Sequence, residues 1–96
     1  MFICVLTYTA PAEDVAALRP AHLAFLKEQH AAGHFIGWGR QASGQGGVIF
    51  AKGTDRAVVE AVEAGDPYLT GGVASVEVIE MNVAFLSPDF VADVTT

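Results

Sequence analysis

His22 is the first residue whose type and position predict chemistry. An imidazole changes charge near neutral pH, so His22 is suited to act as a general acid or base. On a helical wheel it falls inside an apolar stripe made of Val15, Leu18, Phe25 and Leu26. A polar ring that faces the interior needs a hydrogen-bonding partner. That partner is either a second side chain of a functional site or a backbone carbonyl that satisfies an ordinary core histidine.

Asp66 is the carboxylate best placed to be this partner. The residue stands directly before Pro67, a position typical of a helix cap, and capping alone is the simpler interpretation. In the topology expected below, however, Asp66 and the first part of the helix that carries His22 lie at the same edge of the sheet. A carboxylate there would hold one ring nitrogen and leave the other free to move a proton.

Four more residues are candidates for binding a substrate around this pair. Arg19 precedes His22 by one turn and would meet an anionic group, unless it is an ordinary solvated charge. Tyr68 would place a hydroxyl near the pair or simply pack its ring. Ser43 would offer a hydroxyl from a hairpin loop. Gly39 lies in a glycine-containing strand, which marks either the close approach of a ligand or backbone, or a bulge or tight helix crossing.

Neither a metal site nor a cofactor site is predicted. His30 and His34 fall near a helix end, where a cation suits the helix dipole, and no cysteine or acidic cluster accompanies them. The single cysteine, Cys4, lies in an apolar run and is expected to be a small buried side chain rather than half of a disulfide. Phe35 and Trp38 are expected in the core or in an interface.

Length and charge limit the kind of protein this can be. The 96 residues suffice for a single domain, 1–96. Five Lys and Arg against eleven Asp and Glu give a formal net charge of −6, which disfavours nucleic-acid binding. No signal peptide and no apolar run of membrane-spanning length are recognisable, so no membrane association is expected and a cytoplasmic location is the default.

The first half of the chain predicts two strands around one main helix. Phe2–Tyr8 is β-branched and aromatic on both alternating faces, as in a central strand. A short helical or turn-like segment over Ala12–Ala17 is expected to precede the main helix. The main helix should begin near Arg19, because Pro20 is tolerated in a first turn. This helix should end near Ala32, with Gly33 as its cap. A second strand follows over His34–Gln41.

The second half predicts two more strands around a second helix. After a loop over Ala42–Gly47, a strand is expected at Val48–Lys52, and Thr54 should cap the next helix. The buried side of that helix is predicted to be made of Ala57, Val58, Ala61 and Val62. Gly65 should end it, and Asp66 should open a short segment that Gly71 and Gly72 close. The last strand is expected over Ala74–Phe85, and the residues after Ser87 form an arm or tail.

The order of these elements is βαββαβ, which is typical of an α+β, ferredoxin-like domain with a four-stranded antiparallel sheet. Such a domain carries both helices on one face of the sheet. The first and last strands are apolar on both faces, and 52% of the residues are hydrophobic, more than one small core usually hides. We therefore expect a second copy of the chain to cover the other face, which gives a homodimer.

Three segments resemble the YciI-like (YCII-related) family: RPAHLAFL at 19–26, AGHFIGWG at 32–39 and GDPYLTGGV at 65–73. The resemblance extends over nearly the full length, and it implies a ferredoxin-like fold that pairs into a dimeric α/β barrel. It also implies a His–Asp active site at His22 and Asp66. Many members of that family have a proline after the strand-two glycine, followed by a longer loop, whereas here Arg40 and a short loop follow Gly39. The resemblance therefore implies the pair but not the substrate.

Three hypotheses follow for the function. The first is a small-molecule enzyme of the lyase or isomerase type, in which His22 oriented by Asp66 transfers protons on a small organic substrate that is ring-bearing or anionic. The second is a non-catalytic module that binds a metabolite in the same cleft. The third is an accessory dimer in which the histidine is only packed. Turnover separates the first two hypotheses, and a closed, dry cleft would favour the third.

Overall fold

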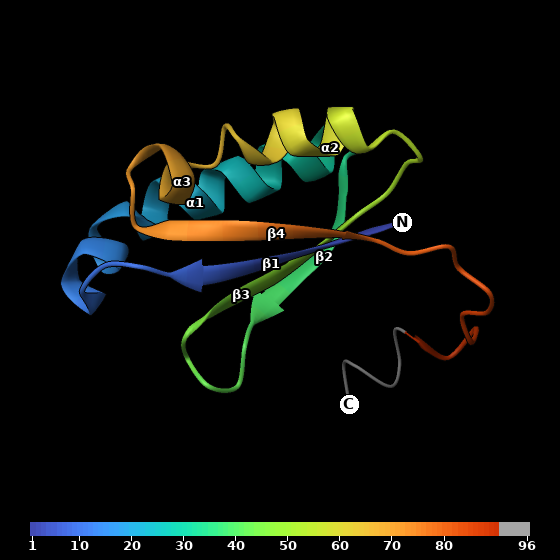
Figure 1. The fold of residues 1–96 in the computed structure, drawn as a ribbon, viewed down its shortest axis with the longest axis horizontal. Helices are drawn as coiled ribbons and strands as arrows, with labels where there is room; N and C mark the ends of the chain where they lie inside the picture. The colour runs from blue at the N-terminus through green and yellow to red at the C-terminus, as the bar shows by residue number, and fades with distance from the viewer. Residues whose placement is uncertain (91–96) are drawn as a thin grey trace.

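The computed structural model describes residues 1–90 and places four strands and three helices in them. The elements in chain order are β1 (Phe2–Tyr8), α1 (Ala12–Ala31), β2 (Phe35–Arg40), β3 (Gly46–Ala51), α2 (Arg56–Glu63), α3 (Pro67–Thr70) and β4 (Ala74–Glu80). The strands form one antiparallel sheet in the order β2-β3-β1-β4. The three helices cover one face of this sheet (Figure 1). This is the ferredoxin-like α+β fold predicted from the sequence, with α3 as an additional single turn.

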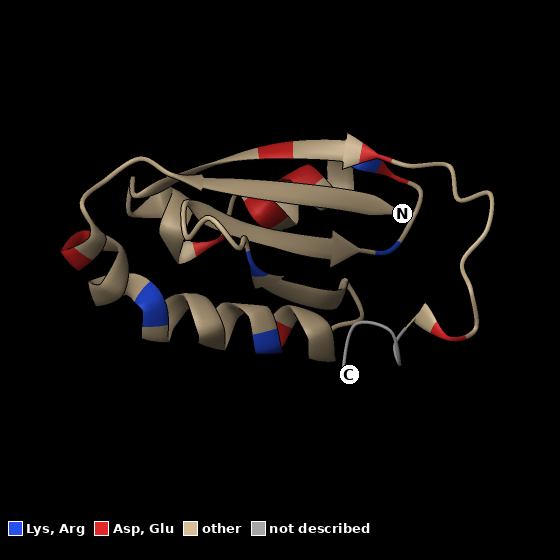
Figure 2. Cartoon of the chain, turned by 90° about the horizontal axis from the view of Figure 1, so that it is seen from below, with Lys and Arg blue, Asp and Glu red and all other residues tan. Residues whose placement is uncertain are grey.

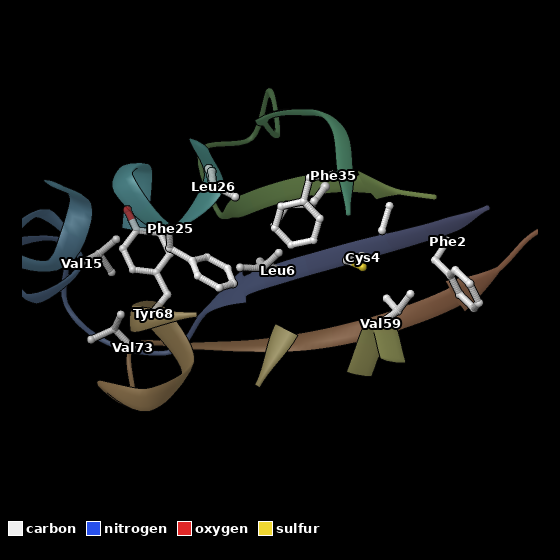
Figure 3. Packing of buried hydrophobic residues seen from close by; sticks show 12 residues of the cluster. Phe2, Cys4, Leu6, Val15, Phe25, Leu26, Phe35, Val59, Tyr68 and Val73 are labelled. Atoms are coloured by element: carbon white, nitrogen blue, oxygen red, sulfur yellow. The ribbon is translucent and has the colours of Figure 1, made fainter. Parts of the chain in front are cut away.

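The core lies between the helices and the central strand β1. Alternate residues of β1 point toward the helices and are almost fully buried: Phe2, Cys4 and Leu6. Phe25 and Leu26 of α1 pack onto these residues, and Phe35, the first residue of β2, belongs to the same core (Figure 3). The prediction that Cys4 is a small buried side chain is confirmed, and burial raises the pKa of its thiol to about 12, which keeps it protonated and unreactive.

α1 is a single helix, so the prediction that the main helix begins near Arg19 is wrong. It continues through Pro20, where one hydrogen bond of the helix is lost at a cost of about 3 kcal/mol. Val15 before the proline and Phe25 after it are both buried, and this burial offsets the loss. The predicted end is confirmed: Gly33 has a φ of 87°, and the His34 N–H bonds the carbonyl of Gln29 at 2.9 Å.

The strand boundaries depart from the predicted ones mainly at β4. This strand ends at Glu80 rather than Phe85, because Glu80 pairs with Phe2 at the start of β1 and no further residue of β1 remains to be paired. Val83 and Phe85 lie beyond it and are exposed. β3 begins at Gly46, two residues earlier than predicted, and β2 is one residue shorter at each end. The predicted arm after Ser87 is described only as far as residue 90.

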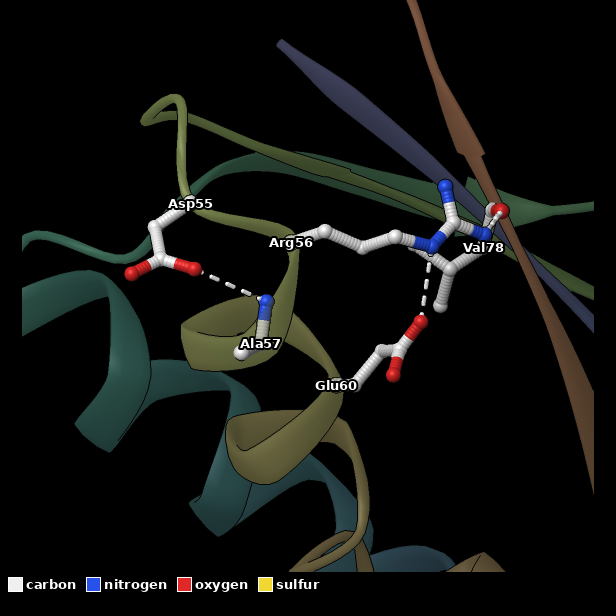
Figure 4. Close-up of polar contacts among 5 residues, drawn as sticks. All are labelled: Asp55, Arg56, Ala57, Glu60 and Val78. Carbon is white, nitrogen blue, oxygen red and sulfur yellow. Dashed lines mark hydrogen bonds and ion pairs between the residues drawn. The ribbon is translucent and has the colours of Figure 1, made fainter.

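α2 differs from its predicted orientation. Asp55, not Thr54, caps it, and the Asp55 carboxylate accepts a hydrogen bond from the Ala57 N–H at 3.0 Å (Figure 4). Its fully buried side chains are Val59 and Glu63, whereas Val58 is 46% exposed. The predicted buried side is therefore wrong, since Ala57 and Ala61 are exposed as well and Val62 is only partly buried.

The face of the sheet opposite the helices is largely apolar, although the exposed Glu77 lies there opposite Val5, and none of the helices in residues 1–90 covers it (Figure 1). Ile3, Val5, Val48 and Phe50 are only partly buried there, and Ile79 is 42% exposed.

The five Lys and Arg residues are spread along the chain rather than gathered in one patch (Figure 2). None of the helices in the described part of the chain has the length and apolar character needed to cross a membrane.

Candidate active site

His22 and Asp66 meet between α1 and the N-terminus of α3. The imidazole Nδ1 lies 2.8 Å from Asp66 Oδ1. The His22 side chain is 12% exposed and that of Asp66 is fully buried. Because an ionised carboxylate only accepts hydrogen bonds, the proton of this bond belongs to Nδ1. The other ring nitrogen, Nε2, then remains for a ligand.

Asp66 makes both contacts considered for it from the sequence, to His22 and to the N-terminus of α3. Its Oδ1 also accepts a hydrogen bond from the Tyr68 N–H at 2.9 Å, which caps α3, and Pro67 occupies the first position of that helix. The second carboxylate oxygen, Oδ2, is buried and has no hydrogen-bond partner within residues 1–90. The helix cap therefore fixes the carboxylate that holds His22.

A close contact between α1 and α3 brings the two residues together. Gly71 ends α3 directly against Leu18 of α1. A β-carbon at Gly71 would lie 2.3 Å from Leu18 Cδ1 and 2.8 Å from the carbonyl oxygen of Pro67, which is closer than van der Waals contact allows. Because position 71 has no side chain, α3 packs close enough for Asp66 to reach His22.

Two tyrosines complete the surroundings of the imidazole. The ring of Tyr68 stacks on that of His22, with a centroid distance of 3.8 Å and an interplanar angle of 10°. Tyr8 contacts Tyr68 edge-on at 5.8 Å. Burial raises the pKa of the Tyr68 phenol, although the positive charge of Arg19 opposes the shift. Tyr68 therefore stays neutral and holds the imidazole in one orientation.

His22 opens onto a cavity of about 250 Å³ between α1 and the β2–β3 hairpin. The polar and aromatic residues that line it are Tyr8, Arg19, His22, Trp38, Arg40 and Tyr68, and the remaining walls come from Leu6, Leu23, Leu26, Gly39, Gly47, Val48 and Ile49. Two of the five Lys and Arg residues of an acidic chain thus lie at one small cavity. This cavity favours a small ligand with apolar surface and a negative charge.

Most of the binding residues expected from the sequence lie at this cavity. Arg19, Tyr68 and Gly39 line it, whereas Ser43 does not: its hydroxyl accepts a hydrogen bond from the Gln45 N–H within the exposed hairpin loop, 3.2 Å away. Gly39 has nothing within 4 Å of the place where its β-carbon would stand, and the bulge considered as an alternative occurs nearby, between Phe35 and Gly37.

Three of the polar and aromatic lining residues are not among those expected at the site. Tyr8 continues the buried alternation of β1 and is recognisable by that pattern. Arg40 follows Gly39 directly, and in the sequence it stands out only as a departure from the family. Trp38, 38% exposed, is expected from the sequence in the core or an interface, and its place at the cavity depends on the bulge that precedes it in β2.

The other histidines do not join the pair. His30 Nδ1 lies 2.9 Å from the carbonyl oxygen of Phe35, and its ring contacts Trp38 edge-on. Among residues 1–90, no three His, Cys, Asp or Glu side chains are grouped in a way that would hold a metal ion.

Known proteins share this fold at low sequence identity. The dehydrochlorinase TftG of Burkholderia phenoliruptrix AC1100, which acts on 5-chloro-2-hydroxyhydroquinone and was solved with 2,5-dihydroxybenzoquinone, has a TM-score of 0.66 and 17% identity over 85% of this chain and 94% of its own. Rv0793 of Mycobacterium tuberculosis has a TM-score of 0.57 and 17% identity over 88% of this chain and 98% of its own. No protein of curated function matches the chain in sequence.

The family is recognisable from the sequence itself. The three segments that resemble YciI-like proteins all lie within residues 1–82, which match the family model of the YCII-related domain. This match covers β1 to β4 and both members of the His22–Asp66 pair. The chain therefore belongs to the YCII-related domain family.

Proposed function

We propose that this protein is a small-molecule enzyme in which His22 transfers a proton and Asp66 orients it. The observation that carries the proposal is the 2.8 Å hydrogen bond between a fully buried carboxylate and an imidazole that lines a cavity. With Nδ1–H donated to Asp66, the lone pair of Nε2 takes the proton from the substrate. The nearby carboxylate then stabilises the imidazolium, which returns the proton in the second half of the reaction.

The substrate class proposed is a small, single-ring or similarly sized organic molecule with acidic hydroxyl or carboxylate groups. An apolar cavity of about 150 Å³ is enough to hold benzene, so the 250 Å³ here leave room for a substituted ring. Arg19 and Arg40 supply positive charge for an anionic substituent, and Trp38 supplies an aromatic surface. The similarity to TftG, whose structure contains a dihydroxybenzoquinone, supports this class.

The reaction type proposed is isomerisation or elimination. In either, His22 removes a proton from carbon or from a ring hydroxyl, and the electron pair moves into the ring or onto a carbonyl oxygen near an arginine. In an elimination, a leaving group departs with its own electron pair from the neighbouring carbon. An acyl-transfer route is not proposed, because Ser43 lies away from the cavity.

Turnover of hydroxylated quinones and hydroquinones, followed by their absorbance, tests the proposal in wild type and H22Q. Glutamine nearly preserves the volume of the side chain but cannot take up a proton, so we expect kcat to fall by about 10³-fold or more while binding persists. H34Q is the matched control and keeps full activity, because His34 does not line the cavity. Binding of these compounds without turnover would support a metabolite-binding module instead, and full activity of H22Q would exclude His22 as the catalytic base.

We also propose that two copies pair through the open face of the sheet. The partly buried apolar side chains of Ile3, Val5 and Phe50 lie next to one another there on β1 and β3. Together with Ile79 they form an apolar surface that would be exposed to solvent in a monomer. V5E would place a charge in the middle of the paired faces. We expect sedimentation analysis to show a dimer for wild type and for A24E, on the exposed side of α1, and a monomer for V5E. A wild type that stays monomeric at about 100 μM, tenfold or more above the Kd of a stable homodimer, would contradict the pairing.

A further inference from the structure

Glu63 is a second buried carboxyl group in the helix layer. It belongs to the last turn of α2, three residues before Asp66, and the Asp66 N–H bonds the Glu63 carbonyl oxygen at 3.0 Å. The Glu63 side chain is 1% exposed, and neither of its carboxyl oxygens has a hydrogen-bond partner within residues 1–90. An ionised carboxylate without partners is costly to bury, so a neutral acid is the stable form here.

The groups around Glu63 favour this neutral form. Burial raises the pKa of Glu63 to about 7, and the negative charge of Asp66 acts in the same direction. Cys4 of β1 is a neutral thiol and brings no charge; its contact lowers the pKa of Glu63, but burial and Asp66 outweigh it. On α2, Arg56 and Glu60 are bonded to each other at 2.7 Å and are about half exposed, so they largely neutralise one another (Figure 4).

His22 and Glu63, which both neighbour Asp66, border two different cavities. On one side, His22 opens onto the cavity of the proposed active site, whose lining does not include Glu63. On the other side, Glu63 borders a second cavity of about 370 Å³ between α2, α3 and β4, lined otherwise by Arg56, Glu60, Ala64, Leu69, Val76 and Val78. The side chains that α3 and β4 contribute there are apolar. Glu63 is therefore a titratable group near Asp66 that does not line the cavity in which His22 would contact a substrate.

We propose that Glu63 is a positioning residue of the His22–Asp66 site, buried as a neutral acid so that the negative charge of the carboxyl pair stays on Asp66. When Glu63 is protonated, Asp66 alone balances the imidazolium that forms during proton transfer. When Glu63 loses its proton, a second negative charge stabilises the imidazolium further, and His22 releases its proton less readily. The role rests on the proposed acid–base function, but the coupling itself is measurable without any substrate.

The test is an NMR titration of the isotope-labelled full chain, which follows the Glu63 carboxyl carbon and the His22 ring. In wild type, Glu63 should titrate near pH 7, and D66N should shift this step to lower pH because the neighbouring charge is gone. E63Q has no proton to lose there, so the His22 ring signals should follow the Glu63 step in wild type and lack that step in E63Q. E28Q changes an exposed glutamate of α1 that lines neither cavity and should leave both titrations unchanged.

Two results would overturn the inference. A Glu63 carboxyl that titrates in wild type near 4.5, the ordinary value, would show that it is not held neutral, and this measurement needs no variant. Identical His22 titrations in folded E63Q and wild type would show that Glu63 does not act on the pair. These failures are distinct from a failure of the proposed function, which would appear as unchanged turnover in H22Q.

Discussion

Asp66 and Glu63 are two buried carboxyl groups three residues apart, and they have opposite surroundings. Asp66 accepts hydrogen bonds from the His22 imidazole and from the Tyr68 N–H. Glu63 accepts none from residues 1–90, although it is buried to the same extent. The degree of burial therefore does not explain the difference. It is explained by the groups that the neighbouring helices and strands place next to each carboxyl group.

The difference shows how one small core supports two protonation states. α1 brings a histidine and α3 brings the Tyr68 N–H at its N-terminus, and both stabilise a negative charge on Asp66. β1 brings a neutral thiol to Glu63, whose lowering effect on the Glu63 pKa is outweighed by burial and by the charge of Asp66, while β4 brings only the apolar side chains of Val76 and Val78. Asp66 is thus suited to orient a catalytic base, whereas Glu63 is suited to hold a proton.

D66N is the strongest test of this comparison. Asparagine caps helices as well as aspartate does, so α3 should keep its N-terminus and the free energy of unfolding should change by about 1 kcal/mol or less. The amide cannot stabilise an imidazolium, and its NH₂ group favours the wrong tautomer of His22. We expect kcat/KM to fall by about 10²-fold or more, as is seen when the aspartate of a catalytic triad is replaced by asparagine. A D66N protein with wild-type kcat/KM on a ring substrate would reduce Asp66 to a helix cap.

The stability of the protein should depend on pH through Glu63. In the unfolded chain the carboxyl group has its ordinary value of 4.5, whereas in the folded protein burial raises its pKa to about 7. Between these values the folded state holds a proton that the unfolded chain has released, so the folded state loses stability as the pH rises. The loss approaches about 3 kcal/mol above pH 7, because a tenfold difference in proton affinity between the folded and unfolded states is worth about 1.4 kcal/mol.

Urea denaturation at pH 5 and pH 8 measures this loss. E63Q mimics the neutral acid at every pH, so its stability relative to wild type should rise by about 2.5 kcal/mol from pH 5 to pH 8, since a small part of the loss has already occurred at pH 5. E60Q controls for the removal of a charge from α2, because Glu60 is about half exposed and bonded only to Arg56. An E63Q difference that is the same at both pH values would mean that Glu63 is ionised in the folded protein.

The surroundings of Asp66 are predictable from the sequence, whereas the burial of Glu63 is not. The order of the elements, the cap at Gly33 and the meeting of His22 with Asp66 all follow from local patterns combined with one topology. In the short helix that precedes Asp66, alanines and valines occupy several faces, so their pattern does not define which face is buried. Glu63 in particular carries no signal of burial, since glutamate almost never lies in a core without a partner.

The extent of the elements also depends on contacts that local patterns do not contain. β4 stops where β1 has no more residues to pair with, although the apolar alternation continues as far as Phe85. α1 extends through Pro20 because buried side chains on both sides outweigh one lost hydrogen bond. Arg40 and Trp38 reach the cavity through the strand pairing and bulge of β2, a feature of tertiary structure.

The two aspartate caps provide the smallest expected effects. Asp55 caps α2 from an exposed position and makes one hydrogen bond, to the Ala57 N–H. D55A should therefore cost about 1 kcal/mol of stability, the usual value for an exposed cap, and leave turnover unchanged.

D66A removes a buried carboxylate that serves both α3 and His22, and it should cost about 2 to 3 kcal/mol, because the imidazole loses its partner as well. Urea denaturation of both variants compares them directly. Equal losses would mean that the bond between Asp66 and His22 adds no stability, and that the two are held together by the packing of α3 on α1 alone.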